Sequence, residues 1–460
     1  MLQRPFPRTI LCALLTCHVA FAADVRPFPD GETITLEQAY DRALETDQSV
    51  RIAYFQVRKA NLLPWSALTR LGPQISASGQ YSRSERANRS TVNEISVGPG
   101  LDSLSRSVER TSHSRSGFGE AGFSVQQPLI DFTVFGAYQA GKLSVQITRL
   151  QHQFTVRETL FGVATAYYEV LKQQRLVYVN RETFRLAREQ LDVSQIRANV
   201  GEVTRSDVLR ATVTVETARR DVVESENTLE LDRNTLGNIL NLKPNTPFRV
   251  VEPPNYPTTL PVFDQLLQRA YTHREDLKVE DFTIEQELAR RRQILGQYGP
   301  RVVAQFDSGL AHTSGTSSNS TRDWQATMSV QVPIFTGGQR EIDLRTAKYQ
   351  IEQARLNREV VAKTVEDDVK RGWLTVRSLE ETLKALKVQV QAAEQSYQDL
   401  QNQYRAGTAT SVDVLSALND FNAARRDLAV QTYVYQVALR NLEQVAGVFQ
   451  ETRVDRVKLP

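Results

Sequence analysis

An internal repeat is the strongest constraint that this sequence places on its own fold. GEVTRSDVLRA, beginning at Gly201, returns as GTATSVDVLSA, beginning at Gly407. The segments VQQPLID and VQVPIFT, beginning at Val125 and Val330, extend the match backwards at nearly the same spacing. An ungapped match of this kind predicts that the two halves of the chain share one structural plan.

Each half contains a stretch of more than a hundred residues without proline. Proline is the residue that most strongly interrupts a helix, so long helical hairpins are predicted at 134–241 and 338–447. Each hairpin turns at a glycine, and its second helix is predicted to start at Thr204 or Ser411. Heptad seams coincide under the repeat and indicate close helix packing. They consist of Val208, Val215, Val222, Leu229 and Leu236 in the first half, and of Val414, Phe421, Leu428, Tyr435 and Leu442 in the second.

Short segments of alternating polarity flank the predicted helices and pair into β-hairpins at 73–130 and 300–335. Each segment has apolar residues on one face and mainly polar residues on the other. About ten residues of such alternation are typical of a membrane β-strand, although a half-buried strand of a soluble sheet fits any single segment equally well. The polar sequences at 82–116 and 312–322 are predicted to be exposed loops. The four segments begin at Gln74, Gly117, Arg301 and Trp324.

The number of predicted strands has a consequence for assembly. Four strands cannot close a barrel, and open strand edges cannot remain in lipid. If these strands lie in a membrane, the chain is expected to pool them with copies of itself, giving eight or twelve strands.

The first residues and the repeat together divide the chain. Two arginines, an apolar run and small residues in an A-x-A arrangement predict a secretory signal peptide over 1–22. A lipoprotein signal that uses Cys17 is an alternative. The first repeat is assigned to 23–242, a proline-rich linker to 243–261 and the second repeat to 262–460, with a C-terminal tail after its helical hairpin.

Composition excludes several classes of function. The net charge of +3 is too small to argue for a nucleic-acid partner. Both cysteines, Cys12 and Cys17, lie in the predicted signal segment, and no later stretch approaches the about 20 apolar residues of a membrane-spanning helix. The histidines lack metal-ligand spacing, and no nucleophile elbow or phosphate loop occurs. We therefore expect no enzyme activity, no cofactor and no metal site.

Several motifs resemble one known family, the TolC-like outer-membrane efflux proteins. They are TLEQAYDRAL near the mature start, VQQPLIDF and VQVPIFTGG at the strand-to-helix entries, and RANVGEVTRSDVLRA and YRAGTATSVDVLSALNDF at the hairpin tips. The resemblance covers almost all of the mature chain. It implies a mostly α fold with membrane β-structure, in which a homotrimer forms a 12-stranded outer-membrane β-barrel continued by a long periplasmic α-helical coiled-coil barrel.

The resemblance also implies a function. Such a protein is a passive exit duct in the outer membrane of a Gram-negative cell, with a periplasmic extension, and serves tripartite efflux or type I secretion. Its partners would be membrane lipid, a periplasmic adaptor (membrane fusion) protein, and an inner-membrane transporter of the RND, ABC or MFS class. The sequence does not identify the cargo. The alternative function is that of a non-porous periplasmic coiled-coil scaffold.

The resemblance assigns a periplasmic gate to the hairpin tips. Three copies of Asp413, together with Asp207, would form an acidic ring that attracts cations, and crowding would raise the pKa of Asp413. A closing contact is expected between Tyr404 and Asp207. Relatives can carry a second aspartate and a locking arginine where this chain has Ser416 and Ala409, so a single ring and a looser latch are predicted. Both aspartates also suit the positive end of a helix dipole.

Three further groups of residues receive roles. Pro128 and Pro333 are predicted to mark the bend from strand to helix. Aromatic residues of the strands are candidates for interfacial girdles, although simple packing explains each of them equally well; they are Tyr81, Phe123, Phe306, Trp324 and Phe335. The tip pattern that adaptors grip in the family corresponds to Gly201, Thr204, Leu209, Gly407, Thr410 and Leu415.

Overall fold

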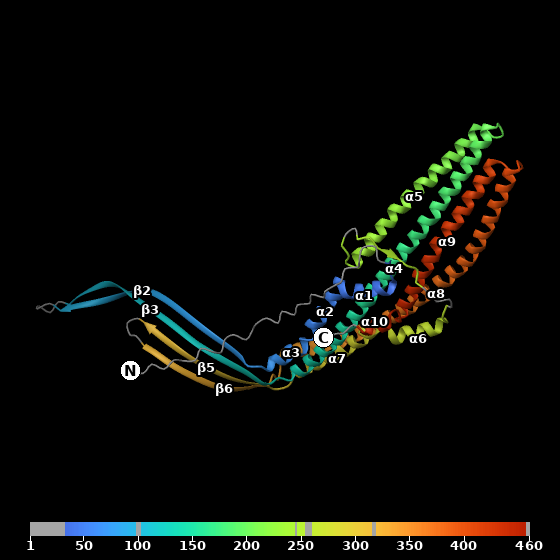
Figure 1. Cartoon of the computed structure of the whole chain (residues 1–460). Coiled ribbons are helices and arrows are strands. Elements are labelled where there is room, and N and C mark those ends of the chain that lie inside the picture. The colour runs from blue at the N-terminus through green and yellow to red at the C-terminus, as the bar shows by residue number, and fades with distance from the viewer. Residues whose placement is uncertain (1–32, 98–102, 244–245, 254–259, 315–318, 457–460) are drawn as a thin grey trace, which may run out of the picture. The chain divides into compact units, whose positions relative to one another are not determined.

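The computed structural model describes residues 33–97, 103–243, 246–253, 260–314 and 319–456. The predicted signal peptide, with Cys12 and Cys17, lies outside these residues. The described chain is mainly helical (Figure 1). Its helices are α1 (Leu36–Thr46), α2 (Gln48–Ala60), α3 (Leu63–Leu68), α4 (Thr133–Asn199), α5 (Arg205–Ile239), α6 (Phe263–His273), α7 (Glu275–Gly296), α8 (Gln339–Arg405), α9 (Ser411–Val445) and α10 (Glu451–Arg456). Its strands are β1 (Thr33–Ile34), β2 (Gln74–Val97), β3 (Ser103–Ile130), β4 (Arg249–Val250), β5 (Arg301–Ser314) and β6 (Asn319–Gln331).

Backbone contacts divide the chain into two compact units. The first comprises the described parts of Met1–Ala53, Gln153–Arg274 and Val365–Val457, and the second comprises those of Tyr54–His152 and Glu275–Thr364. The long helices α4 and α8 each contribute residues to both units. Each unit therefore combines segments from both halves of the sequence.

The second unit contains a four-stranded antiparallel sheet in the order β2-β3-β5-β6. The β2–β3 ladder is continuous from Gln74↔Gln126 to Val97↔Ser103, far beyond the last β3–β5 pair, Gly117↔Ser314. The prediction of a loop over 82–116 is therefore wrong for the described residues, and β5 and β6 likewise extend into 312–322. Ladder hydrogen bonds join backbone groups, so a strand can continue where its side chains are polar and both faces meet solvent.

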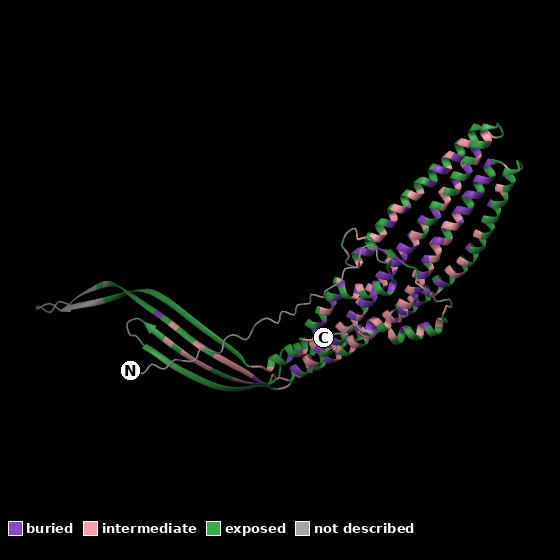
Figure 2. Cartoon of the chain, viewed as in Figure 1, coloured by how far each residue is buried: buried purple, intermediate pink, exposed green. Residues whose placement is uncertain are grey.

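The register places most of the apolar residues of all four strands on one face of this sheet. Ala77, Phe123, Ser308 and Trp324 form one cross-strand row on that face. Neighbouring rows add Ile75, Val125, Phe306 and Ala326 on one side and Gly79, Ala121 and Leu310 on the other. Most of these side chains are exposed, as Figure 2 shows for the sheet as a whole. The alternation of the sequence thus becomes an uncovered apolar surface in the single chain.

The sheet passes into helices at the two prolines that were predicted to mark bends. The β3–β5 register shifts between Pro128 and Ile130, and α4 begins at Thr133. Pro333 follows the end of β6 and precedes α8. Close packing at the first junction depends on a glycine, because a Cβ on Gly296 would lie 2.6 Å from the backbone oxygen of Phe132.

The first unit is built around the paired long helices, α4 with α5 and α8 with α9 (Figure 1). Every residue of the two predicted heptad seams is buried or half-buried. The hairpin helices begin and end within two residues of the predicted limits. No helix among the described residues has both the length and the apolar composition needed to cross a membrane.

Two segments outside the predicted repeat elements, the linker and the C-terminal tail, join the core of this unit, although neither was predicted to form a helix or strand. The linker region supplies β4, which pairs in parallel with β1. The hydroxyl of Tyr167 bridges these segments, because its oxygen lies 2.9 Å from the carbonyl oxygen of Ile34 and accepts from the N–H of Val251. The C-terminal tail forms α10, where Arg453 pairs with acidic side chains of α1. Patterns as short as β4 and α10 are hard to detect, because long-range packing stabilises them.

Candidate functional site: the helical hairpin tips

Each helical hairpin turns at a glycine in the left-handed backbone region. Gly201 has φ +80° and Gly407 has φ +82°, a conformation that costs glycine little and other residues more. The N–H of Glu202 donates to the carbonyl of Arg197, and that of Thr408 donates to the carbonyl of Gln403. These bonds satisfy the last carbonyls of α4 and α8 in the same way, so the sequence repeat is also a repeat of backbone structure.

The helix that leaves each tip begins with a capping box. The backbone N–H of Asp207 donates to the Thr204 hydroxyl, and the Asp207 carboxylate accepts from the backbone N–H and hydroxyl of Thr204. Thr410 and Asp413 make the same three bonds. The predicted start at Thr204 is the N-cap of α5, whereas α9 is capped by Thr410 and starts at Ser411. Both aspartates therefore stabilise helix starts.

The hydrogen bonds to Thr410 lower the pKa of Asp413 below its usual range. This is the opposite direction from the increase that crowding of three copies would cause. In the single chain Asp413 is exposed, so hydrogen bonding is the dominant effect on its carboxylate.

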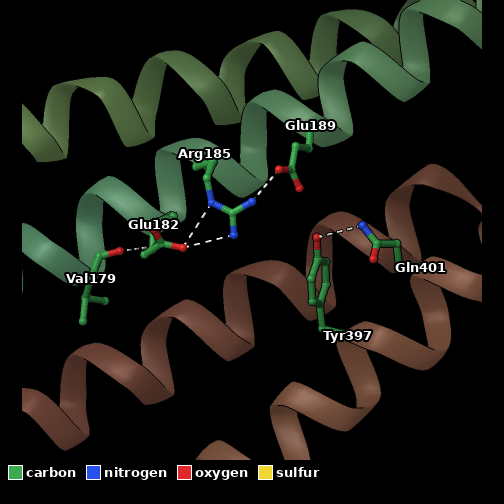
Figure 3. Close-up of polar contacts among 7 residues, drawn as sticks. Val179, Glu182, Arg185, Glu189, Tyr397 and Gln401 are labelled. Atoms are coloured by element: carbon green, nitrogen blue, oxygen red, sulfur yellow. Dashed lines mark hydrogen bonds and ion pairs between the residues drawn. The ribbon is translucent and has the colours of Figure 1, made fainter.

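One apolar cluster joins α4, α5, α8 and α9 close to the tips. Tyr397 of α8 stacks on Phe421 of α9, with ring centroids 6.1 Å apart. Figure 3 shows Tyr397 with its hydroxyl accepting a bond from Gln401, opposite an α4 segment in which Arg185 lies between Glu182 and Glu189. The buried members of the cluster are Ala187, Val215, Ala218, Tyr397, Tyr404, Val414, Ala417, Leu418 and Phe421.

Arg197, in the last turn of α4, connects the two hairpin tips. Its guanidinium donates a hydrogen bond to the backbone carbonyl of Tyr404 and lies 4.5 Å from the centroid of the Tyr404 ring. It also pairs with Glu202 at 2.8 Å, which raises the pKa of Arg197 and holds the guanidinium in place. A cation at the carbonyl end of α8 is favoured by the helix dipole as well. We call these contacts the Arg197 clasp.

The tip residues predicted from the sequence are only partly brought together. The Tyr404 hydroxyl is buried and has no hydrogen-bond partner among the described residues, and the Asp207 carboxylate bonds to Thr204. The expected contact between Tyr404 and Asp207 is therefore not among the hydrogen bonds of the single chain. Arg197 provides an arginine contact between the hairpins that Ala409 cannot make.

The two leucines of the predicted docking pattern differ in their surroundings. Leu209 is 56% exposed, whereas Leu415 is 7% exposed. Leu209 is accompanied by other exposed apolar side chains at the first tip, Ile196, Val200 and Val213. At the second tip, Val412 is 46% exposed, so the first tip presents the broader apolar surface among the described residues.

Arg197 is a candidate site residue that the sequence motifs do not reveal. The repeat places Gln403 at the equivalent position in the second hairpin, so a search for shared residues passes over it. The available signal was a basic residue in the last helical turn before a tip glycine. That signal indicates a helix end, but it does not reveal a contact with a residue about two hundred positions away.

The site offers charge and apolar surface rather than reactive groups. Within the described ranges, no cluster of three or more His, Cys, Asp or Glu side chains could hold a metal ion. The tips combine carboxylates, one clasping arginine and exposed apolar side chains. Such a set can bind a partner helix or change position when a contact is broken.

Comparisons with known proteins agree over nearly the whole chain. The family model described as outer membrane efflux protein matches residues 39–242 and 266–448. Outer membrane protein TolC of Escherichia coli (strain K12) is 25% identical over 348 residues, covering 72% of this chain and 70% of that protein. Proteases secretion protein PrtF of Dickeya chrysanthemi is 23% identical over 447 residues, with 92% and 90% covered. The crystal structure of the Campylobacter jejuni CmeC outer membrane channel has the same fold, with a TM-score of 0.70, 14% identity, and 91% and 86% of the two chains covered.

Proposed function

The chain belongs to the outer membrane efflux protein family, and on this premise we propose that it is one protomer of a passive trimeric exit channel. The channel resides in the outer membrane of a Gram-negative cell and extends into the periplasm. It opens at its helical tips when it docks to a periplasmic adaptor and an inner-membrane transporter. The single observation that carries the proposal is the four-stranded sheet with one apolar face and unpaired outer strands.

The sheet supports insertion in lipid through its two faces and its two edges. From Val302 to Leu310, β5 alternates over the about 9 to 11 residues that a membrane strand requires. In the order β2-β3-β5-β6, the outer strands β2 and β6 each pair on one side only among the described residues. Such edges cannot remain unpaired in a bilayer, so copies must supply the missing pairing. Three copies give a 12-stranded barrel with the apolar face toward lipid.

The long helices also support assembly with copies of the chain. In the first unit, α5 exposes Leu209, Val213 and Leu231, and α8 exposes Leu374 and Val388. These large apolar side chains lie on helices that already use another face for the core. Packing helices from neighbouring copies would bury them and would continue the barrel as a helical tunnel.

The gate of this channel is assigned to the tips. The residues proposed to line or close it are Asp413, Asp207 and Tyr404, and the Arg197 clasp is the contact that must break on opening. The docking surface is proposed to include the tip residues Gly201, Thr204, Leu209, Gly407, Thr410 and Leu415. Because Leu209 is exposed and Leu415 is buried, the first tip is the more accessible part of that surface.

The gate is tested by replacing Arg197 with alanine. The Arg197→Ala variant loses a charge-assisted hydrogen bond and a cation–π contact, which together favour closure by about 2 to 4 kcal/mol. We expect the variant to conduct more ions than the wild-type protein in planar bilayers and to admit bulky antibiotics into cells. Arg205→Ala removes the same charge at an exposed position of the same tip and serves as the matched control. Equal conductance of the wild-type protein and both variants would remove Arg197 from the gate.

A non-porous periplasmic coiled-coil scaffold is the alternative function. It accounts for the helices but leaves the apolar face of the sheet without a purpose. Extraction separates the two: salt releases a scaffold from the envelope, whereas a barrel requires detergent. The inner-membrane transporter is proposed to select the cargo, since the relatives include both an outer membrane protein named without a cargo and a protein named for protease secretion.

A further inference from the structure

Charge is divided between the two faces of the four-stranded part of the sheet. The polar face carries Glu120, Asp307 and Asp323, and it has no lysine or arginine in the rows that all four strands share. The apolar face has no carboxylate in those rows. Its first charged residue in the direction of the hairpin ends is Arg322, which lies opposite Leu310 in the last strongly apolar row. The apolar face therefore ends in positive charge.

More arginines continue this positive edge along the extended hairpin. Arg83 and Arg115 have the same strand parity as Tyr81 and thus lie on the same face, as does Glu85 opposite Arg115. We call Arg83, Arg115 and Arg322 the basic rim. All three are exposed.

Most of the rim is electrostatically uncompensated within the chain. Arg83 and Arg322 make no ion pair with a described residue. Arg115 pairs with Glu85 at 3.1 Å, but both side chains remain more than half exposed. Exposed pairs of this kind contribute little stability and can exchange partners at low cost.

From these positions we infer that the basic rim binds the phosphate groups of lipid headgroups in the outer leaflet. This inference rests on the proposed function, which places the apolar face in the bilayer and the hairpin ends outside the cell. A guanidinium matches a phosphate by two parallel hydrogen bonds, and it lies here where the hydrocarbon layer ends. The acidic residues of the opposite face would line the lumen and would not repel the headgroups.

The edges of the sheet add to this inference. Arg83 lies on β2 and Arg322 lies on β6, the two outer strands of the sheet. Joining copies edge to edge brings a β6 strand beside a β2 strand. The rim of one protomer then continues into the rim of the next, so phosphate sites would occur at each subunit boundary.

The experiment measures binding of bisphosphorylated lipid A to the full-length protein in detergent. The double variant Arg83→Gln with Arg322→Gln is expected to weaken binding about tenfold or more, because each replaced guanidinium loses a charge-assisted contact. Arg86→Gln lies on the opposite face of β2 and is the matched control, with binding expected to be unchanged. Replacement of both rim residues by lysine should restore part of the affinity, since the charge returns without the paired geometry.

Two further binding measurements identify the ligand. Dephosphorylated lipid A should bind the wild-type protein and the double variant equally, and inorganic phosphate should compete only weakly. Equal losses in Arg86→Gln and the double variant, or unchanged binding in the double variant, would overturn the inference. Full competition by inorganic phosphate would instead indicate a site for the free ion, which also overturns it.

The folding of the variants and the proposed function are checked separately. Trimers that survive mild electrophoresis and conduct in planar bilayers show that the variants assemble. If a variant does not assemble, a salt titration of lipid A binding to the wild-type protein tests the inference instead, because binding through phosphates must weaken as salt increases. If the wild-type protein conducts ions but does not bind lipid A, only the inference is contradicted. If it never inserts into a bilayer, the proposed function is contradicted.

Discussion

The two hairpin tips have the same local structure but different surroundings. Both have a glycine at positive φ and a threonine-aspartate capping box. After the cap, however, Leu209 of the first tip faces outward while Leu415 of the second is buried. A shared sequence pattern therefore produced the same turn twice without producing the same surface.

The difference follows from the position of each helix in the four-helix group. The second tip contributes Val414, Ala417, Leu418 and Phe421 of α9 to the shared cluster, whereas α5 contributes only Val215 and Ala218. Because α9 is more enclosed, its leucine has no free side for a partner. The exposed Leu209 is therefore available to a partner, whereas the buried Leu415 contributes to stability.

The largest expected effect separates the two leucines. Leu415→Ala should reduce the free energy of unfolding by about 2 to 5 kcal/mol, because it removes a buried side chain and leaves a cavity. Leu209→Ala should change it by about 0.5 kcal/mol or less, because the side chain is exposed. Urea unfolding of the detergent-solubilised protein provides the measurement. Equal losses in both variants would mean that copies of the chain bury Leu209 as deeply as Leu415.

Removal of a capping side chain should have an intermediate effect on the free energy of unfolding, and the effect should be the same at both tips. Thr204→Ala and Thr410→Ala each remove the side chain that accepts a backbone N–H, at a cost of about 1 kcal/mol. The serine replacements keep the hydroxyl and should retain most of the stability. Unequal losses, read from the same urea transitions, would show that the boxes are less similar in the assembled protein than in the single chain.

Acidification should produce the smallest effect, and it concerns Asp413. Its lowered pKa means that the carboxylate stabilises the cap above the ordinary value of 3.8, and that this contribution is lost as the pH falls through the lower value. If cations that bind to the proposed Asp413 ring block the single-channel conductance, the pH at which half of this block is lost should therefore lie below 3.8. Asp413→Asn should abolish the block and its pH dependence. A midpoint above 3.8 would show that crowding of three carboxylates outweighs the hydrogen bonds of the cap.

Much of the fold could be read from local patterns. The lack of proline and the heptad spacing located the helical hairpins, and alternating polarity located the strands of the four-stranded sheet. The strands extend further than predicted, because backbone pairing in the β2–β3 ladder continues through polar residues such as Arg86 and Asn88. The capping boxes were within reach of sequence reasoning, since threonine and aspartate stand at the required spacing of three.

The sequence by itself therefore determined the repeat, the positions of the long helices and of the paired strands, the turns at Gly201 and Gly407 and the resemblance to a family. These features depend on periodicity and on hydrogen bonds between near neighbours. Only the tertiary structure decided that Arg197 contacts Tyr404, that β4 pairs with β1 and that Leu415 rather than Leu209 is buried. Those outcomes depend on which distant segments pack together. A pattern confined to a few consecutive residues does not specify which distant residues it will contact.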